Sequence, residues 1–153
     1  MAEDGNTLLK MAIKNLKVKE AIELIYPHDD GFVNLMGYHL QQTIELALKH
    51  ILETHGVKYP KTHEILDLIV LLPEKYQSCT EKIKLRSREI SHLEADTRYN
   101  KSYHASKELV NEVSDLAAEL INNIKRLEKS EMKEIEKQAK NNDESLNGGS
   151  PLR

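Results

Sequence analysis

The sequence of 153 residues contains no Trp, one Phe and a single Cys, Cys79. A lone cysteine excludes an internal disulfide framework and a metal site built from several cysteines, and it is typical of a reducing cytoplasm. No apolar run reaches the roughly 18 residues that a membrane-spanning helix needs, and the N-terminus lacks the features of a signal peptide. We therefore expect a soluble cytoplasmic protein with no membrane contact.

Gly and Pro are also scarce, at six and four residues, which is too few for a turn-rich β-sandwich. The net charge of −3 excludes a broadly basic nucleic-acid binder, so any contact with RNA or DNA requires a local basic patch. The chain has no glycine-rich phosphate loop, and we expect no cofactor and no metal. The composition that remains favours a helical bundle built from Leu, Ile and Ala.

Apolar residues recur at three- and four-residue spacing along most of the chain, which is typical of amphipathic helices. We expect an all-α fold, an up-and-down antiparallel bundle of about five helices. The predicted helices cover about residues 7–25, residue 33 to a stop at Gly56, Thr62 to Pro73, Ser78 to about residue 100, and a last one from about Ser102.

Composition divides the chain further. We expect a flexible N-terminus over residues 1–6, the bundle over 7–128, a charged helical extension over 129–140 and a disordered tail over 141–153. Residues 125–144 hold six positive and six negative side chains, and this balance favours a solvated helix. The tail is polar and rich in small residues.

Three segments carry a family resemblance: residues 38–52 (YHLQQTIELALKHIL), Gly56 with residues 60–68 (PKTHEILDL), and residues 95–99 (ADTRY). They resemble, in order, the second helix, the following Gly…Pro-x-Thr-His-x-Leu segment and the Arg-Tyr element of HEPN domains, the "higher eukaryotes and prokaryotes nucleotide-binding" family. The resemblance covers about residues 7–128. It implies a HEPN-like bundle with two long helices, a homodimer and, as in many relatives, a nucleotidyltransferase-like partner protein in a toxin–antitoxin couple.

The resemblance also implies a candidate catalytic pair, because catalytic relatives are metal-independent ribonucleases that carry Arg, four to six residues and then His. Here five residues separate Arg98 from His104. His104 would act as general base or acid on the ribose 2′-hydroxyl. Arg98 would hold the scissile phosphate through paired hydrogen bonds, with Lys101 adding positive potential.

The sequence departs from this pattern at Tyr99, since active members usually carry a small polar residue directly after the Arg. The structural alternative is that Arg98 pairs with an acid such as Asp96 or Glu94. In that case His104 sits on the first exposed turn of the last helix.

Three other polar groups each have a functional and a structural interpretation. The first group could form a pocket for a nucleotide or a partner loop, or a polar network that orients two helices. It consists of His39, Gln42, Glu45 and His63. A basic run predicts either an RNA-phosphate or acidic-partner contact, or an exposed face: Lys82, Lys84, Arg86 and Arg88. Residues 28–30 (HDD) favour a turn that caps the second helix over a metal site.

Three functions stay open on these residues. The first is a dimeric module that works with a nucleotidyltransferase-type partner and binds nucleotide or RNA. The second is a metal-independent endoribonuclease toxin that uses Arg98 and His104. The third is a non-catalytic helical scaffold.

Overall fold

The computed structural model describes residues 7–99 and 102–148, with the side chains of residues 7–94 and 102–145. Within these ranges every regular element is a helix, which confirms the predicted all-α class. The elements are α2 (Thr7–Ile25), α3 (Asp30–Thr54), α4 (Ile65–Ile69), the 3-10 turns η1 (Glu74–Tyr76) and η2 (Ser78–Thr80), α5 (Glu81–Leu85), α6 (Ser87–Tyr99) and α7 (Lys107–Gly148).

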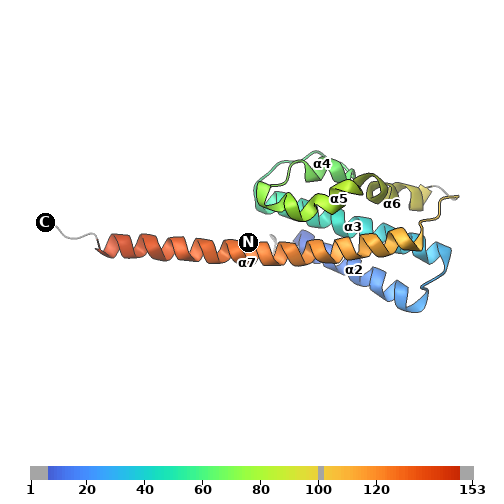
Figure 1. Ribbon diagram of the computed structural model, residues 1–153, viewed down its shortest axis with the longest axis horizontal. Helices are drawn as coiled ribbons and strands as arrows, with labels where there is room; N and C mark the ends of the chain where they lie inside the picture. Colours follow the sequence, from blue (N-terminus) through green and yellow to red (C-terminus); the bar gives the residue numbers. More distant parts are fainter. Residues whose placement is uncertain (1–6, 100–101, 149–153) are drawn as a thin grey trace. The chain divides into compact units, whose positions relative to one another are not determined.

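Helices α2 and α3 form an antiparallel hairpin (Figure 1). Asp29 is the N-cap of α3, and its Oδ1 accepts a hydrogen bond from the Phe32 N–H at 3.2 Å. The Phe32 ring stacks on Tyr26 across the turn, with ring centroids 3.9 Å apart. The 28–30 segment is therefore a capping turn, and no cluster of potential metal ligands exists among the described residues.

Helix α3 is the centre of the bundle, with α2 on one side and α4, α5 and α6 on the other (Figure 1). Gly37 allows α6 to approach closely, because a Cβ atom there would lie 3.0 Å from Leu93 Cδ2. The chain leaves the helix at Gly56, whose φ of 66° is a left-handed conformation that favours glycine. The fully buried apolar side chains of α3 are Met36, Leu40, Ile44, Ala47, Leu48, Ile51 and Leu52.

The segment between α3 and α7 is more broken than its apolar pattern predicts. The predicted third helix shrinks to α4, since Thr62 hydrogen-bonds the Glu64 N–H and Asp67 instead of capping a helix. The Gln77 amide donates to the Ile69 and Leu72 carbonyls, which satisfies backbone acceptors that a continuing helix would have used. The predicted fourth helix divides into η2, α5 and α6, with Arg86 lying between the last two.

Helix α7 differs from the predicted last helix at both ends. It begins at Lys107, not near Ser102, because the Ser106 Oγ accepts the Leu109 N–H and caps it. It continues to Gly148, into the stretch predicted to be a disordered tail. Extending an existing helix adds one hydrogen bond per residue fixed, so polar residues can prolong it.

The described chain divides into two units, one ending at Ile121 and the other beginning at Asn122. The first 15 residues of α7 thus belong to the bundle unit and bury an apolar stripe. That stripe consists of Val110, Val113, Leu116, Ala117, Leu120 and Ile121. No described helix is both long and apolar enough to cross a membrane.

Candidate functional site

The loop that carries His104 joins α6 to α7 and is held by one side chain from α3. The Asn34 amide nitrogen donates to the Tyr103 carbonyl at 2.9 Å, and the Asn34 carbonyl oxygen accepts the Ala105 N–H at 2.7 Å. These two bonds fix the backbone on both sides of His104, whose own side chain is exposed. His104 therefore lies on an anchored loop before α7, and not on the first turn of a helix.

The other two members of the predicted catalytic set cannot be placed beside it. Arg98 lies in the last turn of α6, but its side chain is outside the described residues, as is the whole of Lys101. The pairing of Arg98 with His104, and the alternative pairing of Arg98 with an acid, both stay predictions. Sequence reasoning missed Asn34, because nothing in its helical neighbourhood marks a contact with a loop far along the chain.

An open hollow of about 370 Å³ borders the same loop. Arg88 and His92, one turn apart on α6, line it together with Tyr103, whose carbonyl Asn34 holds. Glu89 and Leu109 complete the lining. A guanidinium, an imidazole and a phenol ring thus line a hollow at the residue before His104, although the sequence singled out only Arg88 among them.

Arg86 is engaged elsewhere. Its Nε lies 3.2 Å from Glu112 Oε1, and its Nη1 lies 3.9 Å from Glu89 Oε1. It borders a second open groove, of about 580 Å³, in which acidic groups outnumber basic ones; the lining is Lys82, Leu85, Arg86, Glu112, Asp115, Leu116 and Glu119. The predicted phosphate contact of Arg86 would have to displace carboxylates, whereas Arg88 faces the hollow by His104.

The predicted polar set resolves into a network around Glu45, whose side chain is only 4% exposed. Glu45 Oε1 accepts from the Gln41 amide at 2.9 Å and from His63 Nδ1 at 3.0 Å, while Oε2 accepts from Lys49 Nζ at 3.0 Å. Gln42 extends the chain by donating to Gln41 Oε1 at 2.7 Å. The network ties the segment before α4 to the middle of α3.

Electrostatics in this network favour the carboxylate. Burial alone raises the pKa of Glu45, but the hydrogen bonds from Gln41, Lys49 and His63 outweigh burial and hold that pKa below its ordinary value. Nearby, Tyr59 is the opposite case, because burial and the hydrogen bond to Glu53 raise its pKa to about 12. Both oxygens of Glu45 accept hydrogen bonds from neighbouring side chains, so the carboxylate serves the network.

His39 does not join this network. Its Nδ1 lies 2.8 Å from Asn15 Oδ1 on α2, so it links the two helices of the hairpin. Burial lowers the pKa of His39 and favours the neutral ring. The structure thus brings together Gln42, Glu45 and His63, and separates His39 from them.

A further charged cluster lies between α2 and the start of α7. Lys19 is 3% exposed, and its Nζ contacts Glu23 Oε1 at 3.1 Å and the Ser114 hydroxyl at 2.9 Å. Lys107 Nζ lies 2.6 Å from Glu23 Oε2. The hydrogen bond from Lys107 is the main reason that the pKa of Glu23 falls below its ordinary value. The burial of Lys19 could have been predicted from the sequence, because Lys19 follows Leu16 by three residues and so continues the apolar stripe of α2.

Comparison with known proteins gives one finding. The HEPN domain family model matches residues 7–140 of the 153-residue chain. No curated protein and no solved structure matches.

Proposed function

The chain belongs to the HEPN domain family, and from this premise we propose that it is a dimeric module that binds RNA or nucleotide beside the His104 loop. We further propose that it works in the cytoplasm with a nucleotidyltransferase-type partner protein, in a toxin–antitoxin-like pair. The family resemblance supports the dimer and the partner, and the loop geometry supports the position of the binding surface.

The observation that carries the proposal is the anchoring of the His104 backbone by Asn34. Two hydrogen bonds, of 2.9 and 2.7 Å, hold the residues before and after His104 while the imidazole stays exposed. A rigid backbone with a free, solvent-facing side chain is the arrangement by which scaffolds present functional groups from loops. A histidine with a purely structural role would instead be packed or hydrogen-bonded into the bundle.

The hollow beside the loop has the chemistry for a phosphorylated ligand. Arg88 offers a guanidinium that can hold two phosphate oxygens, and Tyr103 and His92 offer rings on which a base can stack. Its volume of about 370 Å³ is in the range of small-ligand sites. This combination favours single-stranded RNA or a nucleotide over an apolar ligand.

A homodimer is supported by exposed apolar residues at the end of α2. Leu24, Ile25 and Tyr26 are consecutive and are 87%, 68% and 46% exposed. Contiguous apolar exposure on a small domain is typical of an interaction surface. Light scattering of the purified chain tests this part, with Leu24→Ser as the variant expected to shift the mass from dimer toward monomer.

The exposure of His104 also favours a second candidate function, metal-independent RNA cleavage with Arg98. His104 would take the proton of a ribose 2′-hydroxyl, whose oxygen would then attack phosphorus as the bond to the 5′-oxygen breaks. Arg98 would stabilise the charge that develops on the phosphate, and a proton would pass to the leaving 5′-oxygen. The reaction needs an imidazole that substrate can reach.

One experiment separates the candidates: cleavage and binding of a mixed RNA by the purified chain in excess chelator, beside His104→Ala and His63→Ala. Loss of cleavage in His104→Ala alone would establish the ribonuclease. RNA binding without cleavage, weakened by Arg88→Gln and not by His63→Ala, supports the binding module. If the folded wild type neither cleaves nor binds RNA or nucleotides, the proposed function is wrong.

A further inference from the structure

The second unit of the chain, which begins at Asn122, is a charged helix whose positive and negative side chains are balanced in number. Its cations between residues 122 and 145 are Lys125, Arg126, Lys129, Lys133, Lys137 and Lys140. All six are exposed, and none makes an ion pair with another described side chain. The six cations, however, are not spread evenly around the helix.

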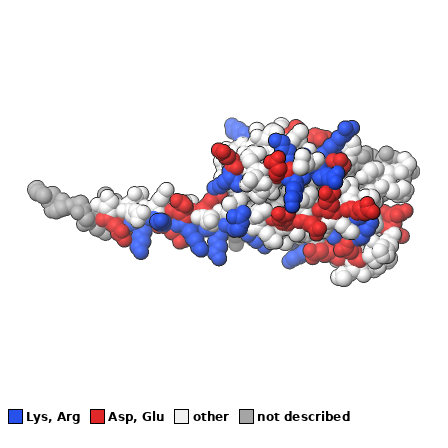
Figure 2. Space-filling view, viewed as in Figure 1, with Lys and Arg blue, Asp and Glu red and all other residues white. Residues whose placement is uncertain are grey.

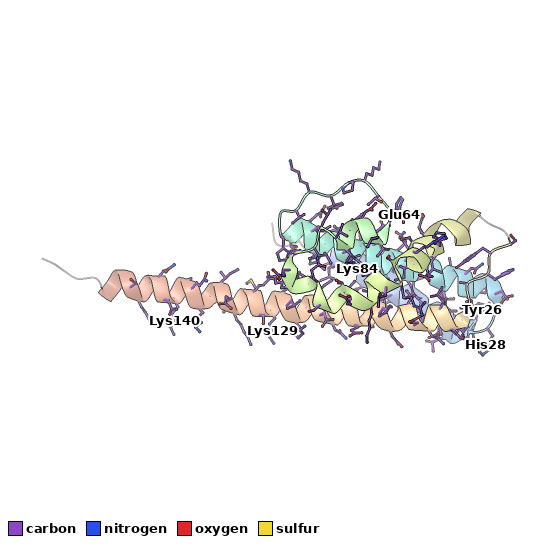
Figure 3. All side chains as sticks on the ribbon, turned by 45° about the horizontal axis from the view of Figure 1, so that its top comes forward. Tyr26, His28, Glu64, Lys84, Lys129 and Lys140 are labelled. Atoms are coloured by element: carbon purple, nitrogen blue, oxygen red, sulfur yellow. The ribbon has the colours of Figure 1, made fainter. Side chains whose placement is uncertain are left out.

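The cations share one face of the helix. At about 100° of rotation per residue, the six side chains fall within an arc of about 120°. Figure 2 shows Lys and Arg side chains of this segment along its lower edge, with acidic side chains on the upper edge and, toward the C-terminal end, on the lower edge as well. Lys129 and Lys140 project from the same side of α7 in Figure 3. We name this face, formed by the six residues above, the basic ridge.

The six acids between residues 122 and 145 are divided between the ridge and the rest of the helix surface. Glu128, Glu131 and Glu134 fall outside the arc of the cations by the same helical rotation. Glu136 falls inside the arc one turn before Lys140, and Asp143 and Glu144 fall inside it beyond Lys140. Between residues 125 and 140 the arc therefore carries six positive charges and one negative charge, in a protein whose net charge is −3.

We propose that the basic ridge binds the phosphodiester backbone of a nucleic acid, without reading its sequence. From Lys125 to Lys140 the helix rises by about 22 Å, so the ridge offers one cation per roughly 4 Å. A nucleic-acid strand presents one phosphate per about 3.4 Å of duplex axis, a similar linear density of the opposite charge. Lysines act there as flexible point charges, which suits backbone contact and carries no base information.

The remaining side chains of the segment argue against a membrane surface as the occupant. A helix that lies in a bilayer interface pairs its basic face with a broad apolar one that carries Trp, Phe or Leu. Residues 122–145 contain no aromatic side chain, and the exposed large apolar ones are Met132 and Ile135. Acids occupy much of the face that a membrane would have to cover.

The first test measures fluorescence anisotropy of labelled single-stranded RNA and DNA of equal length with the full chain, in chelator, from about 50 to about 200 mM salt. The variant is Lys129→Gln/Lys133→Gln/Lys137→Gln. Its matched control removes three exposed α2 lysines, Lys10→Gln/Lys14→Gln/Lys17→Gln, and so makes the same change in net charge. Gln ranks close to Lys in helix propensity, and circular dichroism verifies that each variant stays helical.

We expect the wild type to bind RNA and DNA alike, and the ridge variant to lose at least tenfold in affinity at low salt. The slope of log K against log salt should become shallower by about 2, from three lost contacts at about 0.7 each. The α2 control should keep the wild-type slope. Equal losses in both variants, no loss in the ridge variant, or binding to phosphatidylserine vesicles but to no nucleic acid would each overturn the proposal.

A second pair of variants tests position with identical charge. Glu136→Gln removes the acid that lies among the ridge cations and should tighten binding several-fold, whereas Glu134→Gln removes one outside the arc and should have a smaller effect. Equal effects would mean that net charge, and not the ridge, controls binding. The ridge uses no residue of the His104 loop, so loss of affinity in the ridge variant but not in the α2 control would support the ridge whether or not the proposed function of the loop is correct.

Discussion

The Glu45 network and the His104 loop use similar polar groups in opposite ways. Around Glu45 the side chains satisfy one another: both carboxylate oxygens accept from neighbours, and the group is 4% exposed. At the loop, the Asn34 side chain satisfies backbone groups on either side of His104 and leaves the imidazole exposed. The polar groups of the Glu45 network stabilise the fold. At the His104 loop, the fold instead positions a polar side chain in solvent.

This difference separates a structural role from a functional one. A buried charge is retained only when its hydrogen bonds are satisfied, and once they are satisfied little capacity is left for a ligand. An exposed side chain on a fixed backbone contributes little to stability but is positioned for chemistry. Changes at Glu45 should therefore alter stability first, and changes at the loop should alter function first.

The largest expected effect is that of Glu45→Ala, which leaves Gln41, Lys49 and His63 without their acceptor. We expect a loss of about 2–3 kcal/mol in the free energy of unfolding, measured by urea titration at neutral pH. The loss stays below that of a fully buried ion pair, because the Lys49 and His63 side chains are 16% and 66% exposed and can be rehydrated.

Glu53→Ala on the same helix is the matched control, since its exposed carboxylate accepts only from the Tyr59 hydroxyl at 3.0 Å among the described contacts. We expect it to cost less than about 1 kcal/mol. If the two variants were equally destabilised, the network would not be the stabilising element that its geometry indicates.

Acid should remove part of the same stabilisation. The folded-state pKa of Glu45 lies below its ordinary value of 4.5, so the unfolded chain binds the proton more readily. The contribution is fully present above about pH 4.5 and is lost as the pH falls through the folded pKa. Glu45→Gln, followed by urea unfolding across the acid range, should show a shallower loss of stability than the wild type; parallel curves would contradict the assignment.

The fold was largely predictable because burial follows helical periodicity. The range 7–25 matches α2, and the positive-φ stop at Gly56 and the α3 cap at Asp29 depend on local chemistry that single residues reveal. The breaks around α4 to α6 and the start of α7 were not predictable. They depend on contacts such as those of Gln77 and Asn34 with distant or competing backbone groups.

The candidate site was less predictable than the fold. The spacing of Gln42, Glu45 and His63 predicts a polar cluster, but no local pattern assigns His39 to a different partner. His104 stood out only through its spacing from Arg98. Asn34, which holds the loop, carries no local signal, because its two hydrogen bonds join segments 69 and 71 residues apart.

Asn34→Ala tests the loop side of the comparison. Losing both hydrogen bonds should cost about 1–2 kcal/mol in unfolding free energy and speed hydrogen exchange at the Ala105 amide. RNA binding or cleavage at the loop should fall as far as in His104→Ala, although the imidazole is still present. Asn34→Asp keeps the acceptor for the Ala105 N–H and removes the donor to the Tyr103 carbonyl. Its RNA binding or cleavage should therefore lie between that of the wild type and that of Asn34→Ala. Unchanged RNA binding and cleavage in Asn34→Ala would mean that the anchored loop is not part of the functional site.

The smallest effect is expected at His39, which the sequence grouped with Glu45 but which pairs with Asn15 at 2.8 Å. His39→Gln should cost about 0.5–1 kcal/mol. Its loss should add to that of Glu45→Ala within about 0.5 kcal/mol, because the two residues are about 9 Å apart along the helix axis and share no partner. A larger coupling free energy between His39→Gln and Glu45→Ala would mean that His39 interacts with the Glu45 network.

The contribution of His39 to the free energy of unfolding should depend on pH, and the direction follows from its pKa. Burial holds the folded-state pKa of His39 below its ordinary value of 6.5, so the unfolded chain takes up the proton first on acidification. The stability that comes from the neutral ring is present above about pH 6.5 and falls as the pH drops toward the folded pKa. Urea midpoints of the wild type should therefore decline more between neutral and mildly acidic pH than those of His39→Gln. Because the pKa of Glu45 lies below 4.5, a decline in this window that survives His39→Gln would have to come from groups other than His39 and the Glu45 carboxylate.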